Sequence, residues 1–198
     1  MVELTLGKVF CSDGSVYADA SAATTAGKTP VAKIAYLGKD SETSTANIAF
    51  KNGLALALED VSGTKAWCSQ NSVTCLGTGH QFDSEAGAKG DMAGIDNTDA
   101  LVNNTGHTHA AASAARGYNS GTHPTGTSAW FLPSAGQWNK MIGATGLGLS
   151  NLGLTELAHY WSSTEVSALY AWLFRSDDGS WFSGSRVEVN RVRAVLAF

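Results

Sequence analysis

The stretch from residue 160 onward constrains the fold most strongly, because part of it alternates with the two-residue period of a β-strand. Over residues 171–176, the large aromatic side chains Trp172 and Phe174 alternate with Leu173 and Arg175. Asp177-Asp178-Gly179 predicts a tight turn, and residues 181–189 form the second arm of a hairpin. An apolar run follows at 190–198. This region therefore predicts antiparallel β-sheet.

The first arm of this hairpin can be placed on a core in two ways. Trp172 and Phe174 share one face, and Leu173 and Arg175 share the other. If the first pair buries, then Leu173 and Arg175 face outward beside Phe182, which is the composition of a recognition patch. The alternative is a sheet packed on both faces, with Leu173 and Phe182 in a second core. Alternation alone does not separate these interpretations.

Shorter strand signals fill the first sixty residues. A hairpin is predicted around the Asp13-Gly14 turn. Large Leu and small Ala side chains alternate over 54–58, which is typical of a strand with its large side chains on one face. With no internal repeat or linker, the chain predicts a single domain over residues 1–198. The predicted strands are Lys8–Cys11, Val16–Tyr17, Val31–Leu37, Asn47–Phe50 and Gly53–Leu58.

Two helices complete the expected α+β architecture. The Ala-rich run 99–116 predicts a helix that Gly106 weakens. Residues 133–144 predict an amphipathic helix with Ser134 as its cap. The side chains that would share its apolar face are Trp138, Met141 and Ile142.

The composition excludes several classes of partner. Only 15% of residues are charged, and 13 Lys and Arg against 17 Asp and Glu give a net charge of −4. A broad phosphate-binding surface is therefore not expected, which argues against nucleic acid. No apolar run is long enough to span a membrane, and the chain starts without a recognisable signal peptide.

Three segments carry a resemblance to a known family. Residues 129–138 read AWFLPSAGQW, residues 160–165 read YWSSTE and residues 191–196 read RVRAVL. Together they resemble the C-type lectin fold of the formylglycine-generating-enzyme-like branch. Residues 160–198 further resemble the variable region of a diversity-generating retroelement target protein. The resemblance implies a C-type lectin fold with antiparallel strands, two main helices and long irregular loops.

In that family, a reverse transcriptase copies a template with errors at adenines, and a rigid scaffold displays the resulting hypervariable face. The resemblance implies a protein without catalysis or cofactor that binds a protein or glycan ligand on a cell surface. It would itself be exposed on a bacterial surface or a phage virion. The positions that match the variable sites are Val166, Ser167, Leu169, Tyr170, Leu173, Arg175, Asp177, Ser180, Phe182, Ser183, Gly184, Ser185, Val187 and Val189.

Two other functions remain open. A structural or adhesive module of a fimbria or phage tail would use the same C-terminal face as an assembly contact. An inactive relative of the formylglycine-generating enzymes is also conceivable. Those enzymes use two cysteines late in the chain, whereas this sequence has no cysteine after Cys75.

No metal site is predicted from the three groups of residues that carry metal-ligating side chains. Cys68 and Cys75 lie close enough in sequence for a small disulfide loop, with two reduced thiols as the alternative. His107 and His109 would not converge on the helix expected there. The acids over residues 83–99 match no calcium motif and are interpreted as solvated loop residues.

Overall fold

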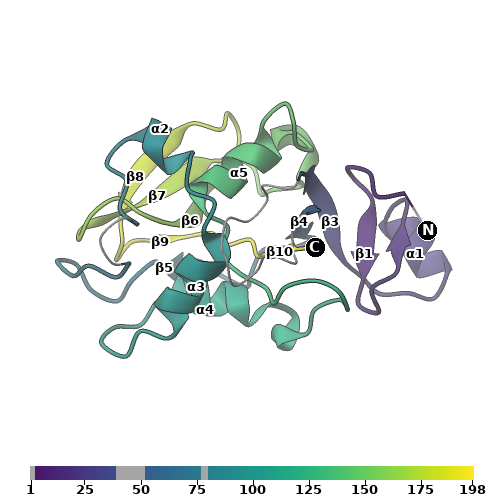
Figure 1. The fold of residues 1–198 in the computed structure, drawn as a ribbon, viewed down its shortest axis with the longest axis horizontal. Coiled ribbons are helices and arrows are strands. Elements are labelled where there is room, and N and C mark those ends of the chain that lie inside the picture. Colours follow the sequence, from purple (N-terminus) through teal and green to yellow (C-terminus); the bar gives the residue numbers. More distant parts are fainter. Residues whose placement is uncertain (1–2, 39–51, 77–79) are drawn as a thin grey trace.

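The computed structural model describes residues 3–38, 52–76 and 80–198. It is a mixed α+β structure with three antiparallel sheets of five, three and two strands. Figure 1 shows the N-terminal strands and helix at one end of the long axis and the strands of residues 159–185 at the other. The predicted strand at 47–50 lies outside the described residues.

The five-stranded sheet joins the N-terminal strands to the last strand of the chain. Its order is β10-β4-β3-β1-β2, and every neighbouring pair is antiparallel. The predicted hairpin around Gly14 is confirmed, and Gly14 has the positive φ that its turn requires. The strands are β1 (Val9–Cys11), β2 (Val16–Tyr17), β3 (Pro30–Leu37), β4 (Gly53–Ala57) and β10 (Val195–Ala197).

Strand β4 separates two hydrophobic cores. Leu54 and Leu56 pack into the cluster around Trp138, whereas Ala55 and Ala57 pack into the cluster around Trp67. The predicted alternation of large and small side chains is therefore confirmed. The alanines pack in the second core, so both faces of the sheet are buried.

The predicted helix over 99–116 is two helices. Helix α3 (Gly94–Val102) ends before α4 (Ala110–Arg116) begins. Between them, the Asn104 side chain accepts hydrogen bonds from the backbone N–H of Gly106 and His107 at 2.9 and 3.1 Å. This local turn competes with helical hydrogen bonding, which is why one Ala-rich segment forms two helices.

Helix α5 (Ala135–Ile142) confirms the second predicted helix and its cap. The Ser134 side chain accepts a hydrogen bond from the Gln137 backbone N–H, and the Gln137 side chain accepts one from the Ser134 backbone N–H. Trp138 and Met141 are fully buried. The other helices are α1 (Ala20–Thr25), α2 (Glu85–Ala88) and the 3-10 turns Tyr118–Gly121 and Leu149–Asn151. No helix in the described part of the chain is long and apolar enough to cross a membrane.

The C-terminal strands form the remaining two sheets. The predicted hairpin is confirmed as β7 (Tyr170–Arg175) paired with β8 (Trp181–Ser185). Strand β6 (His159–Glu165) pairs with the other side of β7, so β8 is an edge strand. Strands β5 (Lys65–Ala66) and β9 (Val189–Asn190) make the small third sheet.

Buried tryptophans connect segments that are far apart in sequence. Each indole N–H donates to a backbone carbonyl, which satisfies its one polar atom within the core. Four of these five bonds join a C-terminal strand to a distant segment, and the bond from Trp130 is local. The donor and acceptor pairs are Trp67 to Ser162, Trp130 to Thr122, Trp138 to Trp161, Trp161 to Lys65 and Trp172 to Phe82.

Asp60 joins the start of β6 to the segment that precedes β10. Its carboxylate accepts hydrogen bonds from the Tyr160 hydroxyl at 2.8 Å and the Thr155 hydroxyl at 3.0 Å. Arg193 donates to it at 2.6 Å and Arg191 at 3.1 Å. The Asp60 side chain is only 11% exposed, so these partners compensate a largely desolvated charge.

This network predicts an alkaline loss of stability. Burial raises the pKa of Tyr160 above its usual value, and hydrogen bonds from Thr155 partly offset that rise. Above a pH of about 10, the unfolded chain loses the phenol proton while the folded chain keeps it. The free energy of unfolding should therefore fall as pH rises, and Tyr160→Phe should make that fall shallower.

Denaturant unfolding at pH values from about 8 to 11 checks this expectation. The comparison uses the slope of the free energy of unfolding against pH. Tyr160→Phe also removes the hydrogen bond to Asp60, which lowers stability by about 1–3 kcal/mol at every pH. Identical slopes in the variant and the parent protein would show that Tyr160 does not contribute to the alkaline loss of stability.

Candidate functional site

The predicted site residues surround the edge strand β8 and the loops on either side of it. Seven of the fourteen are exposed, six are partly exposed, and Leu173 alone is buried. The exposed ones include five large apolar side chains, out of eight such side chains among the described residues. We call these five the C-terminal patch: Leu169, Tyr170, Phe182, Val187 and Val189.

The expectation that Leu173 faces outward is wrong. It lies between Trp161 on β6 and Phe182 on β8, and it is 4% exposed within the core that contains Trp67. Phe174 packs in the other core, with its ring centroid 4.7 Å from that of Trp138. Both faces of the sheet are therefore packed, as the alternative interpretation required. Phe182 departs from that alternative because it stays 41% exposed.

Gly184 is a tightly packed position rather than an open one. A Cβ atom at this residue would meet the Leu173 side chain and would approach the Trp161 ring to 3.2 Å. Any larger residue at 184 therefore requires the buried Leu173 side chain to move. The neighbouring Ser183 faces solvent and has no such restriction.

Arg175 and the residues after it form a self-contained turn. The Arg175 guanidinium makes ion pairs with Asp177 at 2.6 Å and with Asp178. Asp178 also accepts the Ser180 backbone N–H, which lowers the pKa of its carboxyl. Gly179 has a positive φ in the same turn. These groups remain partly accessible, and the Arg175 cation is shared between the two carboxylates.

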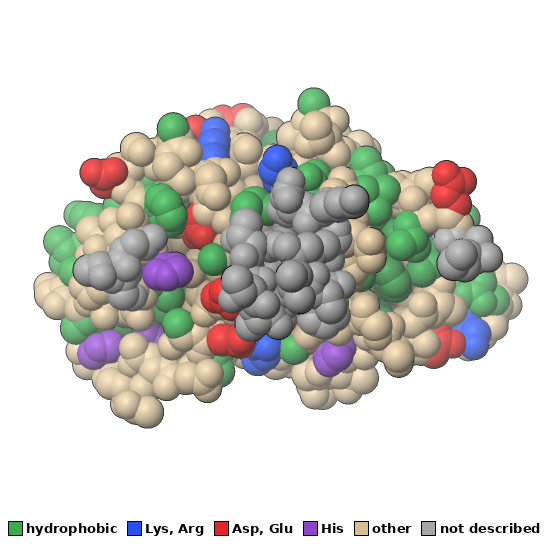
Figure 2. Space-filling model, viewed as in Figure 1, with side chains coloured by type: hydrophobic (Ala, Val, Ile, Leu, Met, Phe, Trp, Pro, Cys, Tyr) green, Lys and Arg blue, Asp and Glu red, His purple; other side chains and the backbone are tan. Residues whose placement is uncertain are grey.

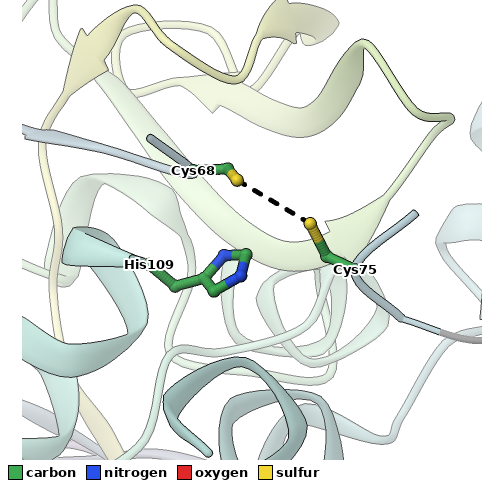
Figure 3. A group of neighbouring side chains, drawn as sticks. All are labelled: Cys68, Cys75 and His109. Carbon is green, nitrogen blue, oxygen red and sulfur yellow. Dashed lines mark hydrogen bonds between the residues drawn. The ribbon is translucent and has the colours of Figure 1, made fainter. Parts of the chain in front are cut away.

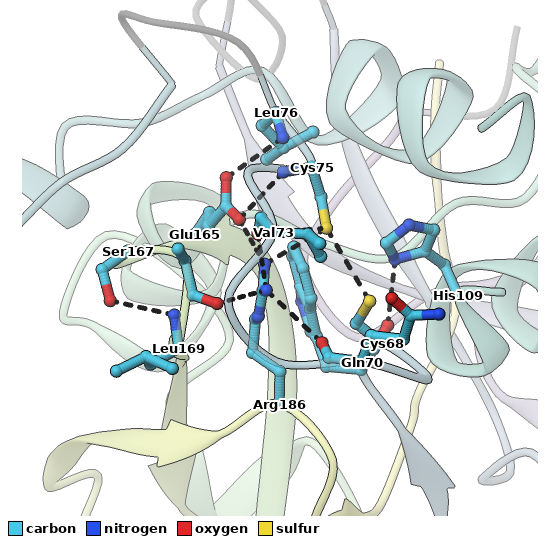
Figure 4. Close-up of polar contacts among 12 residues, drawn as sticks. Cys68, Gln70, Val73, Cys75, Leu76, His109, Glu165, Ser167, Leu169 and Arg186 are labelled. Carbon is cyan, nitrogen blue, oxygen red and sulfur yellow. Dashed lines mark hydrogen bonds and ion pairs between the residues drawn. The ribbon is translucent and has the colours of Figure 1, made fainter. Parts of the chain in front are cut away.

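A buried ion pair stabilises the loop that carries Leu169 and Tyr170. Arg186 and Glu165 are both fully buried and paired, and Arg186 also donates to the Ala168 carbonyl (Figure 4). This pair places the loop between β6 and β7. Neither residue was singled out as a core element from the sequence, because an isolated Arg and Glu give no periodic signal.

The same ion pair holds the loop after β5. Glu165 accepts the backbone N–H groups of Cys75 and Leu76 at 3.1 and 3.0 Å. Arg186 donates to the Val73 carbonyl at 2.6 Å, and its guanidinium lies 5.5 Å from the centre of the Trp67 ring. One buried pair therefore joins residues 67–76 to the C-terminal sheet.

Two cysteines that are close in sequence and one distant histidine meet beside this pair. Cys68, Cys75 and His109 have their ligand atoms within 4.8 Å of one another (Figure 3). The cysteines are free thiols with a sulfur–sulfur distance of 3.8 Å. Burial raises the pKa of Cys75 to about 12, against the lowering effect of Arg186. Burial also lowers the pKa of His109, which favours a neutral imidazole.

Sequence reasoning placed Cys68 near Cys75 but missed His109, because His109 comes from a separate segment. Cys68 and Cys75 both lie in the segment that follows β5, and His109 is the residue before α4. A single helix over 99–116 would have placed His109 inside a helix. The two-helix arrangement instead puts His109 at a helix start beside the cysteines.

Acidic side chains over residues 83–99 contact different protein partners and do not form one cluster. Asp91 is buried and accepts hydrogen bonds from Thr164 at 2.6 Å and from Asn97 at 2.9 Å. Glu85 pairs with Lys89, and Asp99 pairs with Arg116. These acids are therefore engaged with protein partners at separate places. The interpretation of all of them as solvated loop acids is wrong for Asp91.

The surface carries no single dominant charge on the face shown in Figure 2, where basic and acidic side chains are scattered. Apolar side chains are visible between them, including at the end that carries the C-terminal strands. This distribution fits a recognition surface based on shape and apolar contact better than one based on charge.

No family model and no curated protein matches the sequence. Among solved structures, the chain is similar to a fimbrial protein from Bacteroides ovatus ATCC 8483, with a TM-score of 0.68 and 16% identity. The match covers 99% of this chain and 49% of that protein, so the chain spans about half of its length. At this level of identity, the likeness shows a shared fold alone.

Proposed function

We propose that this chain is an adhesive or structural module of a fimbria-like surface assembly, and that the C-terminal patch is its contact face. The observation that carries the proposal is that five of the eight exposed large apolar side chains among the described residues lie on β7, β8, β9 or the loops that join these strands to their neighbours. Apolar and aromatic side chains that stay exposed on a firmly packed sheet are typical of protein contact sites. The fold likeness to a fimbrial protein supports the same class of function.

The packing of the sheet explains how such a face would work. Strand β8 is bound to β7 on one side, and its other side faces no strand among the described residues. An edge strand presents backbone donors and acceptors to a partner. Phe182 and Tyr170 lie on opposite faces of the sheet, so they supply apolar contact area on either side of this edge. Association through this face needs no covalent chemistry, so the chain is proposed to bind rather than to catalyse.

The experiment is sedimentation velocity at low micromolar concentration. The parent chain is expected to self-associate. A variant with Tyr170→Ser, Phe182→Ser and Val189→Ser is expected to self-associate about 100-fold more weakly, because buried aromatic anchors dominate contact energies. The matched control is Val102→Ser with Leu157→Ser, which removes exposed apolar side chains elsewhere and should leave association unchanged. A parent chain that stays monomeric would contradict the assembly proposal.

A second candidate is the ligand-binding protein with a diversified surface that the family resemblance implies, built on a C-type lectin fold. The observation that favours it is that thirteen of the fourteen matched positions retain access to solvent. The test is to sequence the DNA beside the gene for an imperfect copy of codons 160–198. A copy that differs at template adenines, next to a reverse transcriptase gene, is expected under this candidate. Absence of both the copy and the reverse transcriptase gene would contradict this second candidate and leave only the assembly proposal.

A further inference from the structure

The cluster of Cys68, Cys75 and His109 has the geometry of a metal site, which is a separate matter from the C-terminal patch. The two sulfurs are 3.8 Å apart, and the nearest nitrogen of His109 completes a group no wider than 4.8 Å. Two thiolates bound to Zn²⁺ at about 2.3 Å with a tetrahedral angle would be about 3.8 Å apart. A disulfide would require these sulfurs to approach to about 2.05 Å. The observed spacing fits a shared cation without movement of either sulfur.

The orientation of His109 supports this interpretation independently. Its ring is 1% exposed, and Nδ1 lies 3.2 Å from the Trp67 carbonyl, to which it can only donate. Nε2 must then carry a lone pair, and it is buried without a hydrogen-bond partner among the described residues. A buried acceptor without a partner is costly, and metal-binding histidines commonly donate their other N–H to a carbonyl in this way. Nothing else described in the structure explains that nitrogen.

We propose that Cys68 Sγ, Cys75 Sγ and His109 Nε2 bind Zn²⁺, with a water molecule as the fourth ligand. Thiolate and imidazole are soft and intermediate donors that favour zinc over calcium or magnesium. Each thiol releases its proton to solvent when the bond to zinc forms, so two thiolate charges balance the dication. Cys75 is only half-buried, and its side of the cluster gives water access to the fourth position.

The surrounding residues fit this charge balance. The Arg186 guanidinium is already paired with Glu165, and it donates to Cys75 Sγ at 3.1 Å. That hydrogen bond stabilises a thiolate and leaves the other lone pairs of sulfur free. The bound ion would join residues 68–75 to the start of α4. It would therefore stabilise the same loop that Arg186 holds from the opposite side.

The test is Zn²⁺ binding to the full chain, reduced and stripped of metal, in competition with a chromophoric chelator. One Zn²⁺ per chain is expected, with a higher melting temperature when zinc is present. Co²⁺ used in place of Zn²⁺ should give the thiolate-to-cobalt charge-transfer absorption of a tetrahedral site. This spectrum is measured on the parent protein, so it does not depend on whether a variant folds.

The variants Cys68→Ser, Cys75→Ser and His109→Gln should each weaken Zn²⁺ binding more than about 100-fold, since even outer hydrogen-bond partners are worth about 10–100-fold. Two matched controls should retain binding: Cys11→Ser removes the third thiol, and His107→Ala removes the neighbouring imidazole outside the cluster. Reduced protein that takes up no Zn²⁺, or uptake that survives Cys68→Ser, would overturn the proposal. The proposal would also be overturned if Cys68 and Cys75 form a disulfide and the reduced protein still fails to bind Zn²⁺.

Discussion

Replacing Arg186 with alanine is expected to lower the free energy of unfolding by about 3–5 kcal/mol, because it leaves the Glu165 carboxylate buried without its cation. Both side chains are fully buried, so solvent cannot compensate for the loss. The carbonyls of Val73 and Ala168 would lose their donor at the same time. The loop after β5 and the loop before β7 should loosen together.

Denaturant unfolding measures this effect, and Arg175→Ala is the matched control on the same sheet. Arg175 also pairs with carboxylates, but those pairs lie on the surface, where ion pairs contribute little. Its removal should change stability far less than the removal of Arg186. Equal unfolding midpoints for the two variants would show that Arg186 does not organise the sheet.

Leu173 and Phe182 provide the second large effect, since they are cross-strand partners with opposite roles. Leu173→Ala is expected to cost about 2–5 kcal/mol, because it leaves a cavity against Trp161 in the core. Phe182→Ala should cost less than about 1 kcal/mol, because that ring is 41% exposed. Self-association should respond in the opposite order, with Phe182→Ala weakening it and Leu173→Ala leaving it intact wherever the chain stays folded.

Thermal unfolding and sedimentation of the same two variants check this reversal. Leu173→Met serves as the control, because it keeps most of the buried volume and should cost less than about 1.5 kcal/mol. A large stability loss in Phe182→Ala would place its ring in the core and remove the basis for the C-terminal patch. An unperturbed Leu173→Ala would contradict the packing of both sheet faces.

Local signals in the sequence predicted the elements whose stabilising groups are close in the chain. The capping of α5 by Ser134 depends on a partner only three residues away, and the β7–β8 hairpin depends on the turn at 177–179. Where a competing local bond was overlooked, the prediction failed. The Asn104 side chain interrupts the segment expected to be one helix.

The exposure of individual residues in the candidate site was harder to predict. Alternation places residues on faces but does not say what covers each face, so Leu173 and Phe182 could not be distinguished. The answer came from Trp161, a residue on another strand, which packs over Leu173 and leaves Phe182 at the edge. Gly184 is constrained by the same contact.

Short stretches of sequence are enough to predict the antiparallel C-terminal strands, the β1–β2 hairpin and the capped helix. They also pick out residues 166–189, which carry five of the exposed large apolar side chains. Each follows from periodicity, turn chemistry or capping within a short window. Long-range packing is what buries both sheet faces, pairs Arg186 with Glu165 and brings His109 to two cysteines. These contacts join residues distant in sequence, and burial makes their polar groups depend on partners that no local pattern specifies.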